Sequence, residues 1–212
     1  MTVDFGDGYR LRRATDDDHP ALLDICLKTG DAGEDATASQ DDPTLLGNLY
    51  AVPYQVLEPD FAFVLDGPEG VVGYVLGAPD SNEFYARMES EWLEPMRQDV
   101  RDPGPDESQW RGSDAFRRTV HHPGYAFPEA LAPYPSHGHI DLLPQAQGKG
   151  LGTRMLRHLM QELAAAGSPG IHLGVLPSNG RALTFYEKRL GFEPLAAPGL
   201  PSHCIYMVRS LP

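Results

Sequence analysis

Three glycines at alternate positions, Gly148, Gly150 and Gly152, lie in the segment QAQGKGLG at residues 145–152. An apolar run, HIDLLP, precedes this segment, and an amphipathic stretch, TRMLRHLMQELAAA, follows it. Glycines at a strand-to-helix junction let the backbone approach a ligand closely, and the start of a helix offers N–H groups without intrahelical partners. The pattern therefore predicts an anion-binding loop.

The charge distribution favours a phosphate-bearing ligand for this loop. Residues 1–110 hold 24 acidic and 7 basic side chains, a net charge of −17, whereas residues 111–212 hold 6 acidic and 10 basic ones, a net charge of +4. Between Leu142 and Tyr186 the only acid is Glu162. Such a window would attract phosphate, although two acid-poor helices explain it as well. The overall charge of −13 argues against nucleic acid as a partner.

Length and composition favour one globular domain. The chain has 212 residues and 41% hydrophobic residues, and no apolar run reaches the ~18 residues that a membrane span requires. The first residues contain no apolar signal region, and the two cysteines, Cys26 and Cys204, form no metal or redox pattern. We therefore expect a reduced, cytoplasmic protein without a membrane partner.

Two common nucleotide-binding loops do not fit these glycines. A P-loop has Ser or Thr after its lysine, but Lys149 is followed by a glycine. The dinucleotide fingerprint GxGxxG also fails, because the third glycine comes too early and because that motif normally lies near the first strand.

The residues do resemble the GNAT superfamily of N-acetyltransferases, whose acetyl-CoA loop has the pattern Gln/Arg-x-x-Gly-x-Gly/Ala. The sequence matches that pattern in two registers, at 145–150 and at 147–152. Further along, NGRALTFYEKRLGF from Asn179 resembles the family's Asn-x-x-Ala-x-x-Phe-Tyr helix that ends in Gly-Phe. Four residues separate Tyr186 from Gly191 where the family more often has three, so the end of this helix departs from the pattern.

Other segments resemble the C-terminal acetyltransferase-like domain of animal O-GlcNAcases. They are GYVLG from Gly73, EWLEPMR from Glu91, PEALAPYPS from Pro128 and LPSHCIYMVRSL from Leu200, and the resemblance covers most of residues 60–211. The animal domain lacks the glycine loop, which this chain keeps. The resemblance therefore implies a stand-alone bacterial relative that binds acetyl-CoA as its co-substrate.

The glycine loop and its neighbours are the expected cofactor site. Amides at the start of the helix would hold the pyrophosphate, and the loop residues concerned are Gln147, Gly148, Lys149, Gly150, Leu151, Gly152 and Thr153. Lys149 would be either a cation at the rim or a solvated surface lysine. The resemblance implies that backbone groups of Leu142 and Leu143 pair with the pantetheine arm. Asn179 would contact the cofactor or help cap its helix.

Acetyl transfer needs a neutral amine, a donor for the oxyanion and a proton for the leaving thiolate. The resemblance makes Tyr186 the general acid, and the alternative is an aromatic core residue beside Phe185. Neither cysteine lies in a motif, so we expect direct attack by the acceptor amine in a ternary complex.

Side chains alternate along the apolar run that precedes the loop. Ile140 and Leu142 should pack on the following helix, whereas His137, His139 and Asp141 should face the acceptor cleft. Asp141 could take the proton of the amine or anchor a cationic acceptor, and His139, with an ordinary pKa of ~6.5, could be the base instead. A polar row without a catalytic role is the third alternative. We expect no metal, because this spacing gives poor tetrahedral geometry.

The acidic first half favours a cationic acceptor, either a small-molecule amine or a lysine-containing peptide. Residues 99–136 hold six prolines and no clear strand. Such a segment predicts either a lid over the acceptor or a structural flap at the sheet edge. Dimers are common in this fold, so the resemblance also allows a homodimer through the last strand.

The hydrophobic pattern predicts alternating strands and helices. Strands are expected at 9–13, in a hairpin at 61–77, and at 137–143, 171–176 and 201–209; helices are expected at 16–28, 42–50, 81–97, 113–120, 150–166 and 178–190. With the resemblance, this order predicts an α/β GNAT fold, a mixed central sheet of about seven strands flanked by helices and splayed at the cofactor site. One domain would span residues 1–212, with a helix-and-loop insertion at about 80–136.

Two classes of function fit these features. The first is an acetyl-CoA-dependent N-acetyltransferase, and the second is a non-catalytic acetyl-CoA-binding or protein-interaction module. The glycine loop and Tyr186 favour binding and, more weakly, catalysis. Loss of turnover with retained cofactor affinity in Tyr186→Phe would indicate the enzyme.

Overall fold

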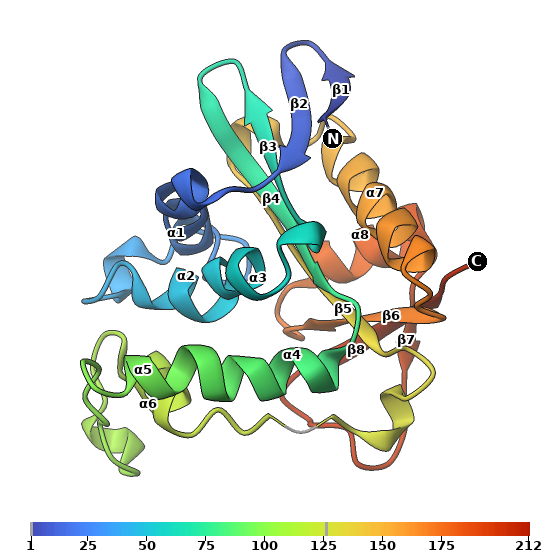
Figure 1. Ribbon diagram of the computed structural model, residues 1–212. Helices are drawn as coiled ribbons and strands as arrows, with labels where there is room; N and C mark the ends of the chain where they lie inside the picture. Colours follow the sequence, from blue (N-terminus) through green and yellow to red (C-terminus); the bar gives the residue numbers. More distant parts are fainter. Residues whose placement is uncertain (1, 126) are drawn as a thin grey trace.

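A computed structural model describes residues 2–125 and 127–212. Its centre is an eight-stranded sheet in the order β1-β2-β3-β4-β5-β6-β8-β7 (Figure 1). The strands are β1 Thr2–Gly6, β2 Tyr9–Arg13, β3 Ala62–Gly67, β4 Gly70–Ala78, β5 Ser136–Leu142, β6 Gly170–Val175, β7 Glu193–Leu195 and β8 Ile205–Ser210. Neighbouring strands are antiparallel except β5 and β6, which are parallel. The predicted mixed α/β fold is confirmed.

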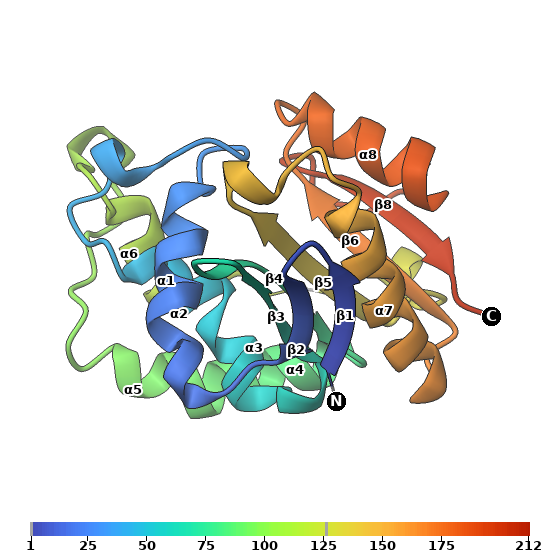
Figure 2. The same cartoon turned by 90° about the horizontal axis from the view of Figure 1, so that it is seen from above.

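Helices cover both faces of this sheet, with α1 and α2 on one side and α7 and α8 on the other (Figure 2). The helices are α1 His19–Lys28, α2 Leu45–Tyr50, α3 Val52–Leu57, α4 Ser81–Arg87, α5 Glu94–Met96, α6 Asp114–His121, α7 Leu151–Ala165 and α8 Gly180–Leu190. A π-helical stretch at Met88–Leu93 joins α4 to α5. In the described part of the chain, no helix has both the length and the apolar character that crossing a membrane requires.

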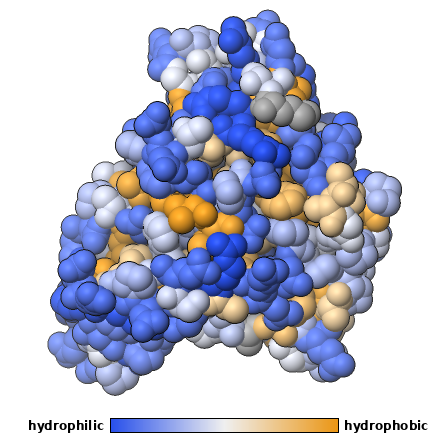
Figure 3. Space-filling view, viewed as in Figure 1, coloured by the Kyte–Doolittle hydropathy of each residue, from blue (hydrophilic) through white to orange (hydrophobic). Residues whose placement is uncertain are grey.

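The sheet separates two hydrophobic cores because side chains alternate along its central strands. Val75 of β4 packs in the core that contains α7 and α8, whereas its neighbours Tyr74 and Leu76 pack in the core of α1 to α4. All three side chains are buried. The face shown in Figure 3 is largely hydrophilic, with apolar residues gathered in patches near its middle. β4 is therefore the strand that both cores share.

Two glycines let α7 approach the middle of the sheet. A Cβ atom at Gly77 of β4 would lie 2.7 Å from a methyl carbon of Leu159, and one at Gly138 of β5 would lie 3.2 Å from the other methyl. Leu159 is fully buried. This contact places the start of α7 beside the end of β5.

Strand β5 pairs with β4 along its whole length but with β6 over only two residues. The pairs with β4 run from Gly73↔Leu142 to Ala78↔His137, whereas those with β6 are Ser136↔Ile171 and His137↔His172. Beyond His137 the two strands separate. The predicted splay is therefore present, and it leaves one edge of β5 without a strand partner over residues 138–142.

The structure adds three elements that the sequence pattern did not predict. Strand β1 is largely exposed and polar, so it lacks the apolar run that marks a buried strand. Helix α3 follows a break at Ala51, whose φ of −130° and ψ of −62° are not helical, and Pro53 stands in its first turn. Strand β7 is only three residues long and contains a proline.

Asn179 caps the last helix, as one of the two alternatives for this residue predicted. The side-chain oxygen of Asn179 accepts a hydrogen bond from the amide of Ala182 at 3.0 Å. At the other end, Gly191 closes the helix in the left-handed conformation with a φ of 65°, as its position in the sequence indicates.

Replacing Leu159 by alanine should lower the free energy of unfolding by about 2–5 kcal/mol, because it opens a cavity between α7 and the two glycines. Urea unfolding followed by circular dichroism measures this change. Gln161→Ala on the exposed side of the same helix is the matched control, and it should change stability by less than about 0.5 kcal/mol. Equal losses in the two variants would contradict this packing.

Candidate active site

A cavity of about 1100 Å³ lies where β5 and β6 separate. Its walls come from the α1–α2 loop, the end of β5, the glycine loop with the first turns of α7, and α8 with the loop before it. Most predicted site residues line it, namely Asp141, Leu142, Gln147, Gly148, Gly150, Leu151, Gly152, Thr153, Asn179 and Tyr186. The others, His139, Leu143 and Lys149, are not among its lining residues.

The glycine loop presents backbone amides to this cavity. Gly148 and Gly150 both have a φ of +73°, a conformation that only glycine adopts without strain. A Cβ atom at either position would meet no heavy atom within 4 Å, so backbone conformation rather than crowding requires these glycines. Gly150 precedes α7 and no side-chain hydrogen bond caps that helix, so its first amides keep no intrahelical partner. The loop therefore fits an anionic group such as a pyrophosphate.

Basic side chains surround the same end of the cavity, and they are Arg154, Arg157, Arg181, Lys188 and Arg189. Arg181 Nη2 donates a hydrogen bond to Gln147 Oε1 at 2.5 Å. Gln147 Nε2 in turn donates to the carbonyl oxygen of Leu142 at 2.7 Å. This chain of contacts fixes the glycine loop between α8 and β5, with the guanidinium of Arg181 beside the loop.

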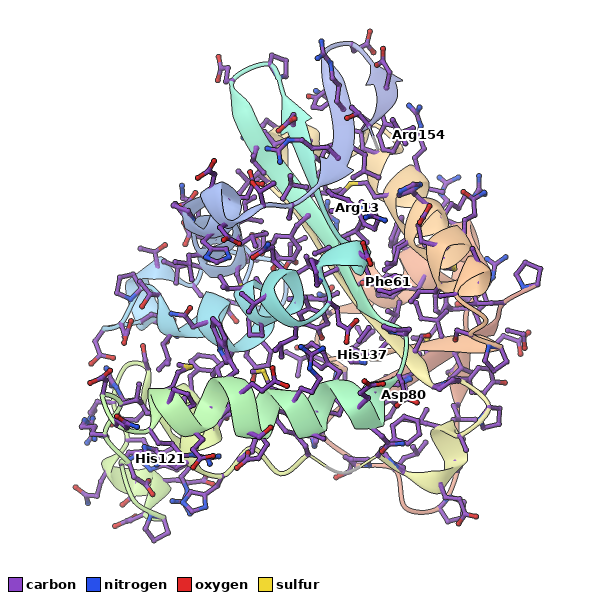
Figure 4. The ribbon with its side chains drawn as sticks, viewed as in Figure 1. Arg13, Phe61, Asp80, His121, His137 and Arg154 are labelled. Atoms are coloured by element: carbon purple, nitrogen blue, oxygen red, sulfur yellow. The ribbon has the colours of Figure 1, made fainter. Side chains whose placement is uncertain are left out.

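Lys149 braces the loop from outside the cavity. Its Nζ donates a hydrogen bond to the hydroxyl of Tyr9 at 2.8 Å and lies 5.0 Å from the centre of that ring. Arg154, labelled in Figure 4, likewise donates from Nη1 to the carbonyl oxygen of Phe5 at 2.6 Å. Both cations therefore tie the β1–β2 hairpin to the loop. For Lys149 this contact differs from both predicted alternatives, a rim cation and a solvated surface lysine.

Leu142 and Leu143 lie on opposite faces at the end of β5. Leu142 lines the cavity, and a Cβ atom at Gly152 would lie 3.1 Å from its Cδ1, so the first turn of α7 packs closely on it. The amide of Leu143 donates to the carbonyl oxygen of Val72 at 2.9 Å, and its side chain packs in the core of α1 to α4. Of the two leucines, only Leu142 faces the space where an elongated ligand would lie.

Asn179 has the predicted capping role and lies at the cavity. It caps α8 and it also lines the cavity. Its Nδ2 lies 3.8 Å from where a Cβ atom of Gly33 would stand, so the loop after α1 approaches the start of α8 here. The two walls of the cavity therefore come close together at Asn179.

Tyr186 lies in an aromatic cluster and also borders the cavity. Its ring centre lies 5.3 Å from that of Phe185 and 5.9 Å from that of Phe192, and only 9% of the residue is exposed. It nevertheless lines the cavity. Burial and the nearby charge of Asp141 raise the pKa of its hydroxyl well above the usual range. The hydroxyl of Tyr186 therefore keeps its proton at neutral pH.

Asp141 is held by two neighbours through one of its oxygens. Oδ2 accepts a short hydrogen bond from the hydroxyl of Tyr74 and lies 3.1 Å from Nε2 of His139. Nδ1 of His139 donates to the carbonyl oxygen of Tyr50 at 2.7 Å. Among the described residues, no hydrogen bond reaches Oδ1 of Asp141. Oδ2 is thus held in place, and Oδ1 is left available to a ligand in the cavity.

Sequence reasoning missed Tyr74, although a signal for it exists in the register. Tyr74 of β4 stands directly opposite Asp141 of β5, and its side chain is fully buried. The hairpin at 61–77 and the strand at 137–143 were both predicted, but their pairing was not. Residues that face each other in neighbouring strands have Cβ atoms about 5 Å apart, so a correct register would have paired these two side chains.

His137 does not face the cleft, contrary to the prediction from alternation. Only 5% of it is exposed, and it lies between the sheet and α4 (Figure 4). Nδ1 lies 2.7 Å from Ser81 Oγ and Nε2 lies 2.8 Å from the hydroxyl of Tyr54. Burial lowers the pKa of this ring well below its usual value. α3 and α4 cover this end of β5, which the sequence pattern could not show.

The proline-rich segment 99–136 is not a lid over this cavity. None of its described residues lines the large cavity. Tyr125 and Phe127 instead line a smaller hollow of about 520 Å³ beside α4. Arg97 donates from Nε to the carbonyl oxygen of Val120 at 2.8 Å, which ties α6 to the end of the α4–α5 helix. These contacts pack the segment against α4 and α5 rather than over the cavity.

An acidic turn after α1 forms the opposite wall of the cavity. Asp31 and Glu34 exchange backbone hydrogen bonds of 3.0 and 2.9 Å, and Ala32 and Gly33 between them have φ values of 51° and 97°. All four residues line the cavity. In residues 2–125 and 127–212, no three His, Cys, Asp or Glu side chains are grouped so that they could hold a metal ion.

Known proteins share this sequence and this architecture. The pattern of the Acetyltransferase (GNAT) family matches residues 123–192. The crystal structure of SsHAT is 35% identical, with a TM-score of 0.86, over 97% of this chain and 99% of that one. The chain belongs to the GNAT acetyltransferase family. The glycine loop and Tyr186 both lie within the matched residues.

Two further similarities bear on this family assignment. Rat protein O-GlcNAcase (Rattus norvegicus) is 28% identical over 204 residues, which is 96% of this chain but only 22% of the rat protein. The structure of yncA from Salmonella typhimurium, solved with its cofactor acetyl-CoA, has a TM-score of 0.53 at 18% identity over 97% of this chain and 95% of that one. At this identity the likeness extends to the fold alone.

Replacing Arg181 by alanine should weaken acetyl-CoA binding roughly tenfold, because a charge-assisted contact to a phosphate stabilises binding by about 1.5–3 kcal/mol. Isothermal titration calorimetry measures this loss. Lys149→Ala is the matched control, since its ammonium group faces Tyr9, and it should change affinity less than Arg181→Ala does. A larger loss in Lys149→Ala would contradict the assignment of the two cations.

Proposed function

We propose that this protein binds acetyl-CoA and transfers its acetyl group to the amine of a cationic acceptor. One observation carries the proposal: uncapped helix amides, basic side chains, Asp141 and Tyr186 all line a single cavity. Membership of the acetyltransferase family supports it. Two structural neighbours solved with acetyl-CoA, from Salmonella typhimurium and Sinorhizobium meliloti, are consistent with this ligand.

The residues at the glycine loop would bind the phosphates. The amides of the loop and of the first turn of α7 would accept the pyrophosphate charge, with Thr153 and Arg181 beside them. The unpaired edge of β5 would hold the elongated part of the ligand at Leu142. Acetyl-CoA would supply an acetyl group on a thioester at the far end of this path.

Asp141 and Tyr186 are suited to the two proton transfers that the reaction needs. Asp141 offers Oδ1 to the ammonium group of an acceptor and can take its proton. Tyr186 keeps its proton at neutral pH, because burial and the charge of Asp141 raise its pKa. It can therefore give that proton to the leaving thiolate, and the second proton that the nitrogen loses as the amide forms restores the hydroxyl.

The acceptor is proposed to be cationic, either a small-molecule amine or a lysine side chain in a peptide. Asp31, Glu34 and Asp141 all line the cavity. These three carboxylates favour a positively charged ligand. The acidic character of the first 110 residues points the same way.

Acetyl-CoA binding is the first property to measure. Calorimetry should give saturable binding of one acetyl-CoA per chain and no saturable binding of ATP, because the elongated β5 edge should favour the pantetheine arm. Absence of acetyl-CoA binding would refute the proposed function. Binding without turnover on a broad panel of amines would indicate a non-catalytic acetyl-CoA-binding module instead.

Tyr186→Phe should lower kcat by about 10²-fold or more with an accepted amine, because the variant loses its proton donor. Affinity for acetyl-CoA, measured by calorimetry, should stay within about twofold. Phe185→Leu is a control for packing on the same helix, and it should affect stability more than proton transfer. Unchanged kcat in Tyr186→Phe would exclude the hydroxyl as the acid.

A further inference from the structure

His139 has no lone pair free to accept a proton. Nδ1 must carry hydrogen, because the group that it faces at 2.7 Å is the carbonyl oxygen of Tyr50, which can only accept. Nε2 faces Oδ2 of Asp141 at 3.1 Å. At this distance a lone pair on Nε2 would lie beside a carboxylate oxygen, which is unfavourable, whereas a protonated Nε2 forms an ion pair with it. Hydrogen on both nitrogens makes His139 an imidazolium and Asp141 a carboxylate.

Tyr74 argues against the other arrangement, in which the proton lies on Asp141. Its hydroxyl donates to the same Oδ2 atom that faces His139. If Oδ2 carried the proton and donated it in a hydrogen bond to Nε2, Oδ2 would be a much weaker acceptor for the hydroxyl of Tyr74. Two donors converging on one oxygen are best satisfied by an ionised carboxylate. The hydroxyl of Tyr74 therefore favours the charged pair.

We propose that His139 is a positioning residue in its imidazolium form rather than the proton acceptor, and that Tyr74 is a second one. Together they hold Oδ2 of Asp141, so that Oδ1 alone faces the acceptor. When Asp141 takes a proton from the acceptor, an N–H bond of the ammonium group breaks and an O–H bond forms at Oδ1. The carboxyl group returns the proton to water when the product leaves. This inference rests on the proposed function.

The groups around His139 agree with a charged ring. Burial by itself would lower the pKa of His139, but the charge and contact of Asp141, with the carbonyl of Tyr50, outweigh burial and raise it. His137, two residues away on β5, is neutral because burial lowers its pKa well below the usual value. On α1, the Cys26 thiol is also neutral, since burial raises its pKa to about 12.

The two roles of His139 predict opposite pH effects. A base must lose its proton to work, so activity would rise as pH passes the pKa of His139. A positioning imidazolium works only below its pKa, and the raised value keeps it charged to higher pH. When pH exceeds that value, Nε2 loses its proton and the contact with Oδ2 weakens. The proposal therefore predicts a loss of activity on the alkaline side.

The ring protonation can be observed directly by ¹⁵N NMR of the full chain labelled at histidine. At pH ~7.5, about one unit above the ordinary histidine pKa of ~6.5, both ring nitrogens of His139 should appear protonated. His139→Gln assigns the signals. In Asp141→Asn the ring should titrate at lower pH, because the charge that raises its pKa is gone. A lone-pair nitrogen signal from His139 at pH ~7.5 in the unaltered protein would overturn the proposal.

Kinetic variants test whether both residues act through Asp141. Tyr74→Phe and His139→Gln should each lower kcat about tenfold while the affinity for acetyl-CoA stays within about twofold. In an Asp141→Asn background neither change should lower kcat further, since residues that act as one unit are not additive. Tyr85→Phe is the matched control, because that ring stacks on Tyr125 away from Asp141. A further loss from His139→Gln in the Asp141→Asn background would identify His139 as an independent base.

The two measurements separate this inference from the proposed function. A chain that binds no acetyl-CoA refutes the proposed function, yet the NMR spectrum still decides whether His139 is an imidazolium. A chain that turns over but shows a neutral His139 keeps the proposed function and refutes the inference. Tyr74→Phe removes a single oxygen atom, so it also serves if His139→Gln does not fold.

Discussion

The site depends on where the pairing between β5 and β6 stops. Two residue pairs join the strands, and beyond His137 they separate while β5 remains fully paired to β4. The separation opens the cavity, leaves one edge of β5 unpaired at Leu142, and admits the first turn of α7 on one side and α8 on the other. If pairing continued by a few more residues, β6 would occupy the space that the ligand needs.

The same β4–β5 pairing that keeps β5 straight also determines the chemistry of Asp141. Tyr74 lies opposite Asp141, and Leu76 lies opposite His139. The carboxylate is therefore approached by a buried hydroxyl from the neighbouring strand and by a ring from its own strand. The carbonyl oxygen of Tyr50, at the end of α2, accepts a hydrogen bond from that ring and fixes its position. A change in register by one residue would turn all of these side chains to the opposite face.

The sequence predicted the elements with strong periodicity and the positions with demanding backbone geometry. The central hairpin, β5, α7 and α8 are where the pattern placed them, and the alternating glycines do have positive φ at Gly148 and Gly150. Short or exposed elements such as β1 and β7 carry too few apolar residues to stand out. Side-chain partners across the sheet, such as Tyr74 for Asp141, depend on a register that no local pattern records.

The charged residues around the glycine loop also show that local sequence patterns do not record contacts between distant segments. Sequence composition identified an acid-poor window that contains Lys149, and proximity to the glycines made that lysine a candidate rim cation. In the structure the β1–β2 hairpin, whose first strand was not predicted, supplies the phenol that holds Lys149. The cavity takes its cations instead from α7 and α8. Proximity in sequence thus identified the right region but not the right side chain.

Asp141 links the two proton transfers that the proposed reaction requires. Its negative charge contributes to raising the pKa of Tyr186, which keeps that hydroxyl protonated as a donor. When Oδ1 takes a proton from the acceptor, this charge is neutralised and one of the two effects that oppose ionisation of Tyr186 disappears. The proton on Tyr186 then becomes easier to release. Deprotonation of the amine by Asp141 therefore favours proton donation by Tyr186 nearby.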